Sequence, residues 1–122
     1  MQNLDQIRAD NALMACGIKA VPSGRPPVGS VAGTAVNKLP ALIVNNGLLA
    51  ASAFADKKRD DLLRAMDAVA WHLADSRVRK LPSDCTTTRG LIEHLVASDS
   101  QALRLAAAEA LNFLSYLKRY AP

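Results

Sequence analysis

The closing segment of the chain, residues 101–120, carries the longest helical pattern in the sequence. It contains no proline or glycine, and its apolar residues recur every three or four positions. This spacing places side chains on one face of an α-helix. The residues of that face are Leu103, Ala106, Ala110, Phe113, Leu114 and Leu117. A helix with one apolar stripe gains most of its stability from packing, so further helices are expected to cover this segment.

The composition favours an all-α fold. Apolar residues make up 50% of the chain and aromatic residues 4%, because alanine and leucine dominate. Both have high helix propensity, and alanine is depleted in strands. A chain of 122 residues is large enough for one modest core. We therefore predict a single all-α domain over residues 1–122, a compact bundle of about five to six helices.

Periodicity, caps and breakers predict where the helices lie. The expected ranges are 4–18, 40–58, 60 or 61 to 79 or 80, 88–97 and 101–120. Pro40 is placed in the first turn of the second helix, where proline is tolerated, and Pro82 ends the third. The second helix is expected to direct four residues toward the core, namely Leu42, Ile43, Leu49 and Phe54.

Two segments contain residues that can break a helix. Asn46-Gly47 is a possible hairpin turn, but the flanking LLAASAFA does not alternate like a strand. Gly47 is therefore interpreted as a close helix contact or a local kink. Residues 19–37 contain three prolines and three glycines, which exclude a continuous helix. We predict a flexible loop there, with one helical turn near 31–37.

No pattern typical of a catalytic or metal site is found. His72 and His94 lie in different predicted helices without an HxxxH or HExxH motif, and both are interpreted as surface or boundary residues. Cys16 and Cys85 form no CxxC motif, so reduced thiols are expected. GxSxG and P-loop motifs are absent from the sequence. We predict no catalytic residues, no metal and no cofactor.

The charge balance is mildly basic. Lys and Arg total 15 against 11 Asp and Glu, a net charge of +4. This excess is compatible with nucleic-acid contact without being diagnostic of it. Charged or amide residues interrupt every apolar stretch, so no membrane contact is expected and the protein is predicted to be cytoplasmic.

Basic residues near helix ends are the candidate binding residues. Arg104 and Lys118 are 14 positions apart, which places them within about 40° around a helix and roughly 21 Å along it. Arg119 lies about 100° further round. The full candidate set for phosphate contact is Arg104, Lys118, Arg119, Lys57, Lys58, Arg59 and Lys38. The alternative for all of them is a solvated face that keeps the protein soluble.

Three segments carry a family resemblance: LDQIRADNAL, LPALIVNNGLLAASAFA and LRLAAAEALNFLSYLKRYA. They resemble, in order and spacing, the small subunit of type III-B CRISPR effector complexes, the Cmr complexes. The matching positions are Leu4, Asp5, Gln6, Arg8, Ala9, Leu39, Pro40, Ile43, Asn46, Gly47, Leu48, Trp71, Leu73, Glu109, Ala110, Leu111, Phe113, Leu114, Tyr116, Leu117, Lys118, Arg119 and Tyr120.

The resemblance implies a non-catalytic subunit that acts in antiviral defence. Several copies would stack along the inner side of a filament of larger backbone subunits, which hold the guide RNA and cut the target. A basic face would follow the target RNA or the guide–target duplex. Its partners would be the backbone and other subunits and these RNAs, with self-association along the filament.

The chain departs from the family pattern at two places. Segment 19–37 replaces a more charged, partly helical connection, and Leu103 stands where an aromatic residue often precedes the Arg of the last helix. Two other functions remain as alternatives. One is a protein-only helical adaptor with solvating basic clusters. The other is a small hydrolase, which would need His72 or His94 beside a cysteine or a carboxylate in a pocket.

Overall fold

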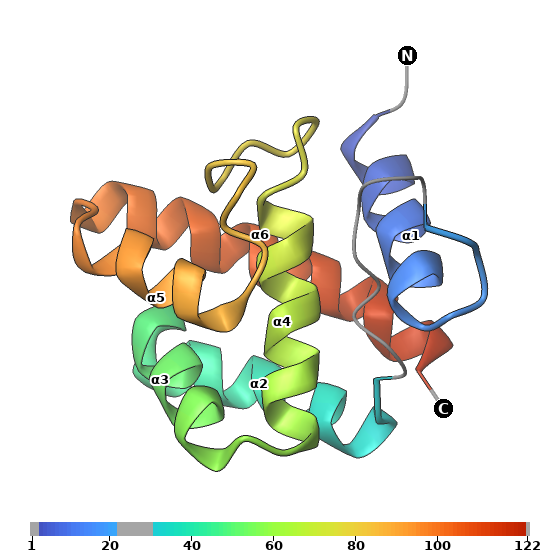
Figure 1. The fold of residues 1–122 in the computed structure, drawn as a ribbon, viewed down its shortest axis with the longest axis horizontal. Coiled ribbons are helices and arrows are strands. Elements are labelled where there is room, and N and C mark those ends of the chain that lie inside the picture. The colour runs from blue at the N-terminus through green and yellow to red at the C-terminus, as the bar shows by residue number, and fades with distance from the viewer. Residues whose placement is uncertain (1–2, 22–30, 122) are drawn as a thin grey trace.

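The computed structural model describes residues 3–21 and 31–121, and the described part is all-α, with six helices and no strand. The helices are α1 (Leu4–Ala15), α2 (Gly33–Asn46), α3 (Leu48–Lys58), α4 (Asp61–Leu73), α5 (Thr88–Val96) and α6 (Ser100–Tyr120). They form one compact bundle (Figure 1). This confirms the predicted fold class.

Helix α6 is the centre of the bundle. At 21 residues it is the longest helix described, and it contacts α1, α2, α3 and α4. Figure 1 shows it passing behind α4, with α5 near its start and α1 near its end. Helix α1 packs chiefly on α6, whereas α5 packs on α3 and α4. The first and last helices of the chain are therefore neighbours.

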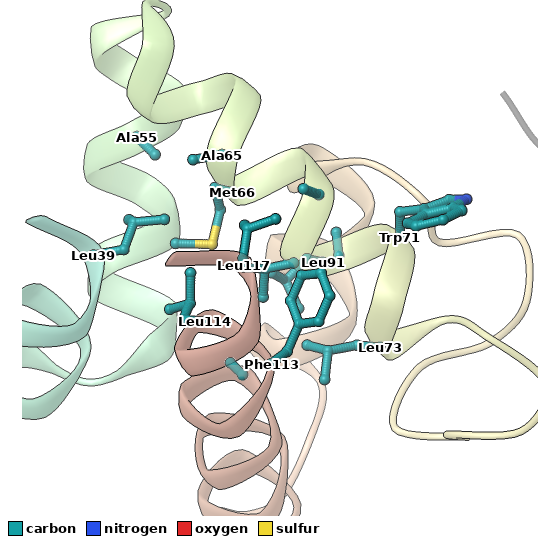
Figure 2. Packing of buried hydrophobic residues seen from close by; sticks show 14 of the residues in the cluster. Leu39, Ala55, Ala65, Met66, Trp71, Leu73, Leu91, Phe113, Leu114 and Leu117 are labelled. Carbon is teal, nitrogen blue, oxygen red and sulfur yellow. The ribbon is translucent and has the colours of Figure 1, made fainter. Parts of the chain in front are cut away.

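The core lies between α4, α6 and the α2–α3 pair. Figure 2 shows Leu39, Met66 and Leu114 converging there from three helices, all of them buried. Ala55 and Ala65 face each other in the same view, and such small side chains let α3 and α4 approach closely. The predicted apolar face of α6 is buried, except that Leu103 is half-buried. Each large side chain buried in this way contributes about 1.5–3 kcal/mol.

The predicted helix over 40–58 is two helices, separated at Gly47. Gly47 has φ 88° and ψ 160°, a conformation that ends α2 and begins α3. Its N–H donates to the Ile43 carbonyl at 2.8 Å, and its own carbonyl accepts from Ala51 N–H at 3.0 Å. The kink interpretation was therefore the better one, although the break is complete.

Helix α2 begins seven residues before Pro40, so Pro40 lies inside the helix and not in its first turn. The placement of Pro40 was wrong because the buried stripe starts earlier in the chain. That stripe comprises Val31, Ala35, Val36, Leu39 and Ile43. The helical turn expected near 31–37 is confirmed as the first part of α2. Residues 22–30 of the predicted loop lie outside the described residues.

Two other helices end earlier than predicted. Helix α4 stops at Leu73, whose carbonyl accepts from the N–H groups of Lys80 and Leu81, both at 3.0 Å. The chain thus folds back on the helix end before Pro82 is reached. Helix α1 stops at Ala15, because Gly17 (φ 76°) and the Ile18 N–H to Leu13 carbonyl bond of 2.9 Å close a Schellman motif.

Side-chain caps begin α1, α4 and α6. Asn3 and Gln6 form a capping box at α1, and Asp60 and Asp99 accept backbone N–H bonds at the starts of α4 and α6. Across residues 3–21 and 31–121, no helix combines the length and apolar character needed to cross a bilayer.

Candidate nucleic-acid interface

The solvent-exposed side of α6 carries basic residues at both ends. Arg104, Lys118 and Arg119 are all exposed, on the side opposite the buried face of the helix. We define the α6 stripe as Arg104, Ala108, Asn112, Ser115, Lys118 and Arg119, all exposed. Ala108, Asn112 and Ser115 have short side chains, and the half-buried Leu111 lies midway between Arg104 and Lys118 along the helix.

The C-terminal end of the stripe is held by local contacts. The Arg119 guanidinium lies 5.7 Å from the centre of the Tyr116 ring, within the range of a cation–π interaction. Lys118 and Arg119 also occupy the last turn, where the helix dipole favours positive charge. Both effects stabilise the exposed cations without using them in ion pairs.

The second basic cluster, Lys57 to Arg59, spreads out around the end of α3. Lys58 lies over the Phe54 ring, with its Nζ 5.6 Å from the ring centre. Arg59 has left-handed backbone geometry (φ 52°) and pairs with Asp56 at 3.5 Å. Lys57 lines a shallow groove between α3 and α5. All three are exposed, but each contacts a different part of the surface.

Lys38 and Lys58 come together in a groove bounded by α2, α3 and the start of α4. The groove has a volume of about 510 Å³. Its lining, which we call the Phe54 groove, is Thr34, Ala35, Lys38, Ala41, Leu42, Asn45, Phe54, Lys58, Asp60, Asp61 and Leu62. Phe54 is 43% exposed, so the prediction that it points into the core was wrong. With the break at Gly47, α3 begins a new helical phase in which Ala51 and Ala55 face the core instead.

Arg89 is a cation that the sequence analysis did not single out. It lies on α5 and donates to Asp56 of α3 at 2.7 Å, so it links the two helices across their shared groove. An isolated arginine in a short helix gives no sequence signal for such a contact. The pairing depends on a partner 33 positions earlier in the chain.

A polar cluster lies on the other side of the bundle, between α1, α4 and α6. Glu109 accepts from Arg8 at 2.7 and 2.8 Å and is hydrogen-bonded to His72 Nε2 at 2.9 Å. His72 is fully buried, and its ring stacks on Phe113 with centroids 4.1 Å apart. The prediction of a surface or boundary histidine was therefore wrong for His72.

The surrounding hydrogen bonds fix the tautomer of His72. Asn11 Nδ2 lies 2.9 Å from His72 Nδ1 and 3.1 Å from an Asp75 oxygen, while Asn11 Oδ1 faces Arg77. This orientation makes the Asn11 amide nitrogen a donor to His72, so Nδ1 accepts and Nε2 carries the proton toward Glu109. A proton added at Nδ1 would point at the Asn11 amino group.

The cluster shifts the pKa values of its members. Burial alone would raise the pKa of Glu109, but the hydrogen bonds from Arg8 and His72 outweigh burial and lower it to about 2. Hydrogen bonds from Arg77 and Asn11 likewise hold the pKa of Asp75 far below its usual range against the effect of burial. Burial lowers the pKa of His72, although Glu109 opposes the shift.

This cluster brings a histidine beside a carboxylate, as the hydrolase alternative requires. However, His72 is 0% and Glu109 3% exposed, so a substrate could reach the pair only if α1 opened. Cys16 and Cys85 are both free, and burial raises the pKa of each thiol, which disfavours the nucleophilic thiolate. Within the described part of the chain, no three side chains of His, Cys, Asp or Glu gather as a metal site.

These features define a small all-α protein with exposed basic surfaces and a buried polar cluster that joins its helices. The comparison with family models matches residues 6–122 to CRISPR-associated protein (Cas_Cmr5). The chain therefore belongs to the Cas_Cmr5 family, the small subunit of type III-B CRISPR complexes. No curated protein and no solved structure shows significant similarity to it.

Proposed function

We propose that this subunit of the type III-B effector complex is non-catalytic and contacts target RNA, or the guide–target duplex, through the α6 stripe. The observation that carries the proposal is the position of Arg104 and Lys118 on one exposed side of α6. Unpaired cations in such an arrangement can bind successive phosphates of one strand without reading its sequence. The backbone and other subunits are the proposed protein partners, with copies of this chain stacked along the filament.

Lys57, Lys58, Arg59 and Lys38 form the second part of the proposed contact. Arg59 is partly neutralised by Asp56, so it contributes less than the lysines. Surface ion pairs of this kind are weak and exchange readily with a phosphate. The contact is thus expected to be distributed over several weak sites, with affinity that falls as salt increases.

Charge reversal on the stripe tests the proposal. The double variant Arg104→Glu, Lys118→Glu should weaken target-RNA binding by a reconstituted effector complex at least tenfold and lower the salt dependence of binding, since each phosphate contact contributes a slope of about 0.7 for single strands. Electrophoretic mobility shift at several salt concentrations measures both quantities.

A matched control reverses the same number of positive charges outside the stripe. Arg79 and Lys80 follow α4 and lie outside the α6 stripe, so Arg79→Glu, Lys80→Glu changes the net charge equally. This control should bind target RNA nearly as well as the unchanged subunit. Equal losses in the two variants would show that total charge matters and that the stripe has no special role.

A protein-only adaptor is the second candidate function. Exposed apolar side chains favour it, because Val96 is 70% and Leu105 is 50% exposed and such groups are common in protein contacts. The two functions differ in the effect of ribonuclease on co-purification with the backbone subunits. An adaptor would remain bound after RNA digestion and would tolerate charge reversal on the stripe.

A further inference from the structure

Phe54 is an exposed aromatic residue in a groove that also contains two lysines. Its ring is 43% exposed, although the chain has only two phenylalanines and the other, Phe113, is fully buried. The ring lies between Lys58, one helical turn along α3, and the α2 residues that line the same groove. An aromatic face beside cations is the combination that binds unpaired bases in single-stranded nucleic acids.

The charges of the groove fit a ligand with two chemically different ends. Lys38 and Lys58 attract phosphate, whereas Asp60 and Asp61 repel it. One Asp60 oxygen already accepts from Leu62 N–H at 2.9 Å. A carboxylate can, however, accept hydrogen bonds from the amino groups of a base. A nucleotide carries both a phosphate and a base, while a simple anion or a uniformly acidic peptide would be repelled by the carboxylates.

The groove also has a suitable size and an adaptable wall. Its volume of about 510 Å³ is within the usual range for small-ligand sites. The Lys58 ammonium group, 5.6 Å from the ring centre, is on a long flexible side chain. It can move from the ring to a phosphate when a base takes its place.

We propose that the Phe54 groove binds one unpaired nucleotide of the RNA strand, with its base stacked on Phe54 and its phosphates beside Lys38 and Lys58. This inference rests on the proposed RNA-binding function and adds to it a site for an unpaired base. A base held in a duplex is already stacked on its neighbours, so the groove selects single-stranded RNA, such as a target segment not paired with the guide.

Phe54→Ala tests the site in the whole 122-residue chain. It should lower the affinity for a labelled single-stranded RNA roughly tenfold while leaving the salt dependence unchanged, because stacking involves no counterion release. Double-stranded RNA should bind the variant and the unchanged protein alike. Phe54→Trp should retain binding, and Lys38→Ala should instead reduce the salt slope by about 0.7. Fluorescence anisotropy measures each effect.

Val96→Ala is the control for loss of an exposed apolar side chain, since Val96 is 70% exposed on α5 outside the groove. It should leave RNA binding unchanged. Circular dichroism should show the same helix content in all variants. The stripe variant Arg104→Glu, Lys118→Glu, measured with the same RNA, separates this inference from the proposed function.

Each other outcome rules out the nucleotide site, and the first also rules out the proposed function. If the unchanged protein binds no RNA, the proposed function fails and this site fails with it. If Phe54→Ala binds normally while the stripe variant is weakened, only the nucleotide site is wrong. Equal losses for single- and double-stranded RNA would also exclude base stacking. Loss of co-purification with other subunits at normal RNA affinity would assign the groove to a protein segment.

Discussion

Glu109 joins three helices through one carboxylate. It is on α6 and accepts from Arg8 of α1 and from His72 of α4, and it is almost completely buried. Bonds to a charged group in such surroundings are strong, and removing one partner leaves the others buried without compensation. The contact between α1 and the rest of the bundle therefore depends heavily on this residue.

Glu109→Gln should destabilise the fold by about 3 kcal/mol, because Arg8 would lose its buried charged partner and keep only the exposed Asp5. Urea denaturation followed by circular dichroism measures the change in the free energy of unfolding. Glu93→Gln on α5 is the matched control, since Glu93 is exposed, and it should change stability by less than about 0.5 kcal/mol. Similar effects of the two substitutions would argue against a structural role for the cluster.

His72 should make stability depend on pH in a defined range. Burial lowers its pKa below the unfolded value of 6.5, so the unfolded chain binds this proton more readily than the folded chain. The free energy of unfolding should thus fall as the pH drops below about 6.5. The Glu109 contribution is lost only at lower pH, as the pH falls from 4.5 toward its folded pKa of about 2.

Urea denaturation between pH 7.5 and 5 separates these effects, because Glu109 stays ionised in both states over most of this range. His72→Gln should be less stable at pH 7.5 and should show a smaller decline toward pH 5. An unchanged slope in this variant would place the titrating group elsewhere.

The sequence alone could not have predicted this cluster. Its members are on helices far apart in the chain, such as Arg8 and Glu109, which are 101 positions apart. Asn11 is a single polar residue on the buried face of α1, and nothing in its own helix indicates a partner on α4. In the structure Asn11 is fully buried, with hydrogen bonds that replace the missing apolar contacts.

Among the helices, the break at Gly47 determines which side of α3 is exposed. Its φ of 88° and ψ of 160° belong to a region that only glycine occupies without strain. A Cβ atom added here would meet nothing within 4 Å. The requirement for glycine is thus a matter of backbone conformation and not of space.

Gly47→Asn should cost about 1–3 kcal/mol, because asparagine does not relieve strain in this region. Gly17→Asn makes a useful comparison, since Gly17 ends α1 with φ 76° in a Schellman motif, where asparagine is tolerated. Thermal denaturation should therefore show a larger drop in Tm for the Gly47 variant. A smaller drop at Gly47 than at Gly17 would contradict the strain argument.

Helix periodicity predicted that helices exist but not where they break. The pattern over 40–58 continues through Gly47 without a gap, and the apolar residues on either side fit one helix equally well. Phe54 was assigned to the core on that basis. The rotation of the helix at Gly47 is a backbone property, so it cannot be read from the apolar pattern.

In the whole molecule, the residues that stabilise the fold and the residues proposed to contact RNA lie in different places. The polar cluster joins α1, α4 and α6 on one side of the core, whereas the α6 stripe and the Phe54 groove are open to solvent. Helical spacing was sufficient to predict that Arg104 and Lys118 share an exposed side. It did not predict that Lys57, Lys58 and Arg59 line different grooves. They do so because α3 ends at Lys58 and the chain turns there.

The packing of α1 on α6 has a consequence for the order in which this protein can be assembled. The first helix leaves the ribosome early, but the carboxylate that binds Arg8 belongs to the last helix. During synthesis α1 lacks its main packing partner until α6 has been translated. A nascent chain that stops short of α6 therefore leaves α1 without its main packing partner, open to proteolysis and aggregation.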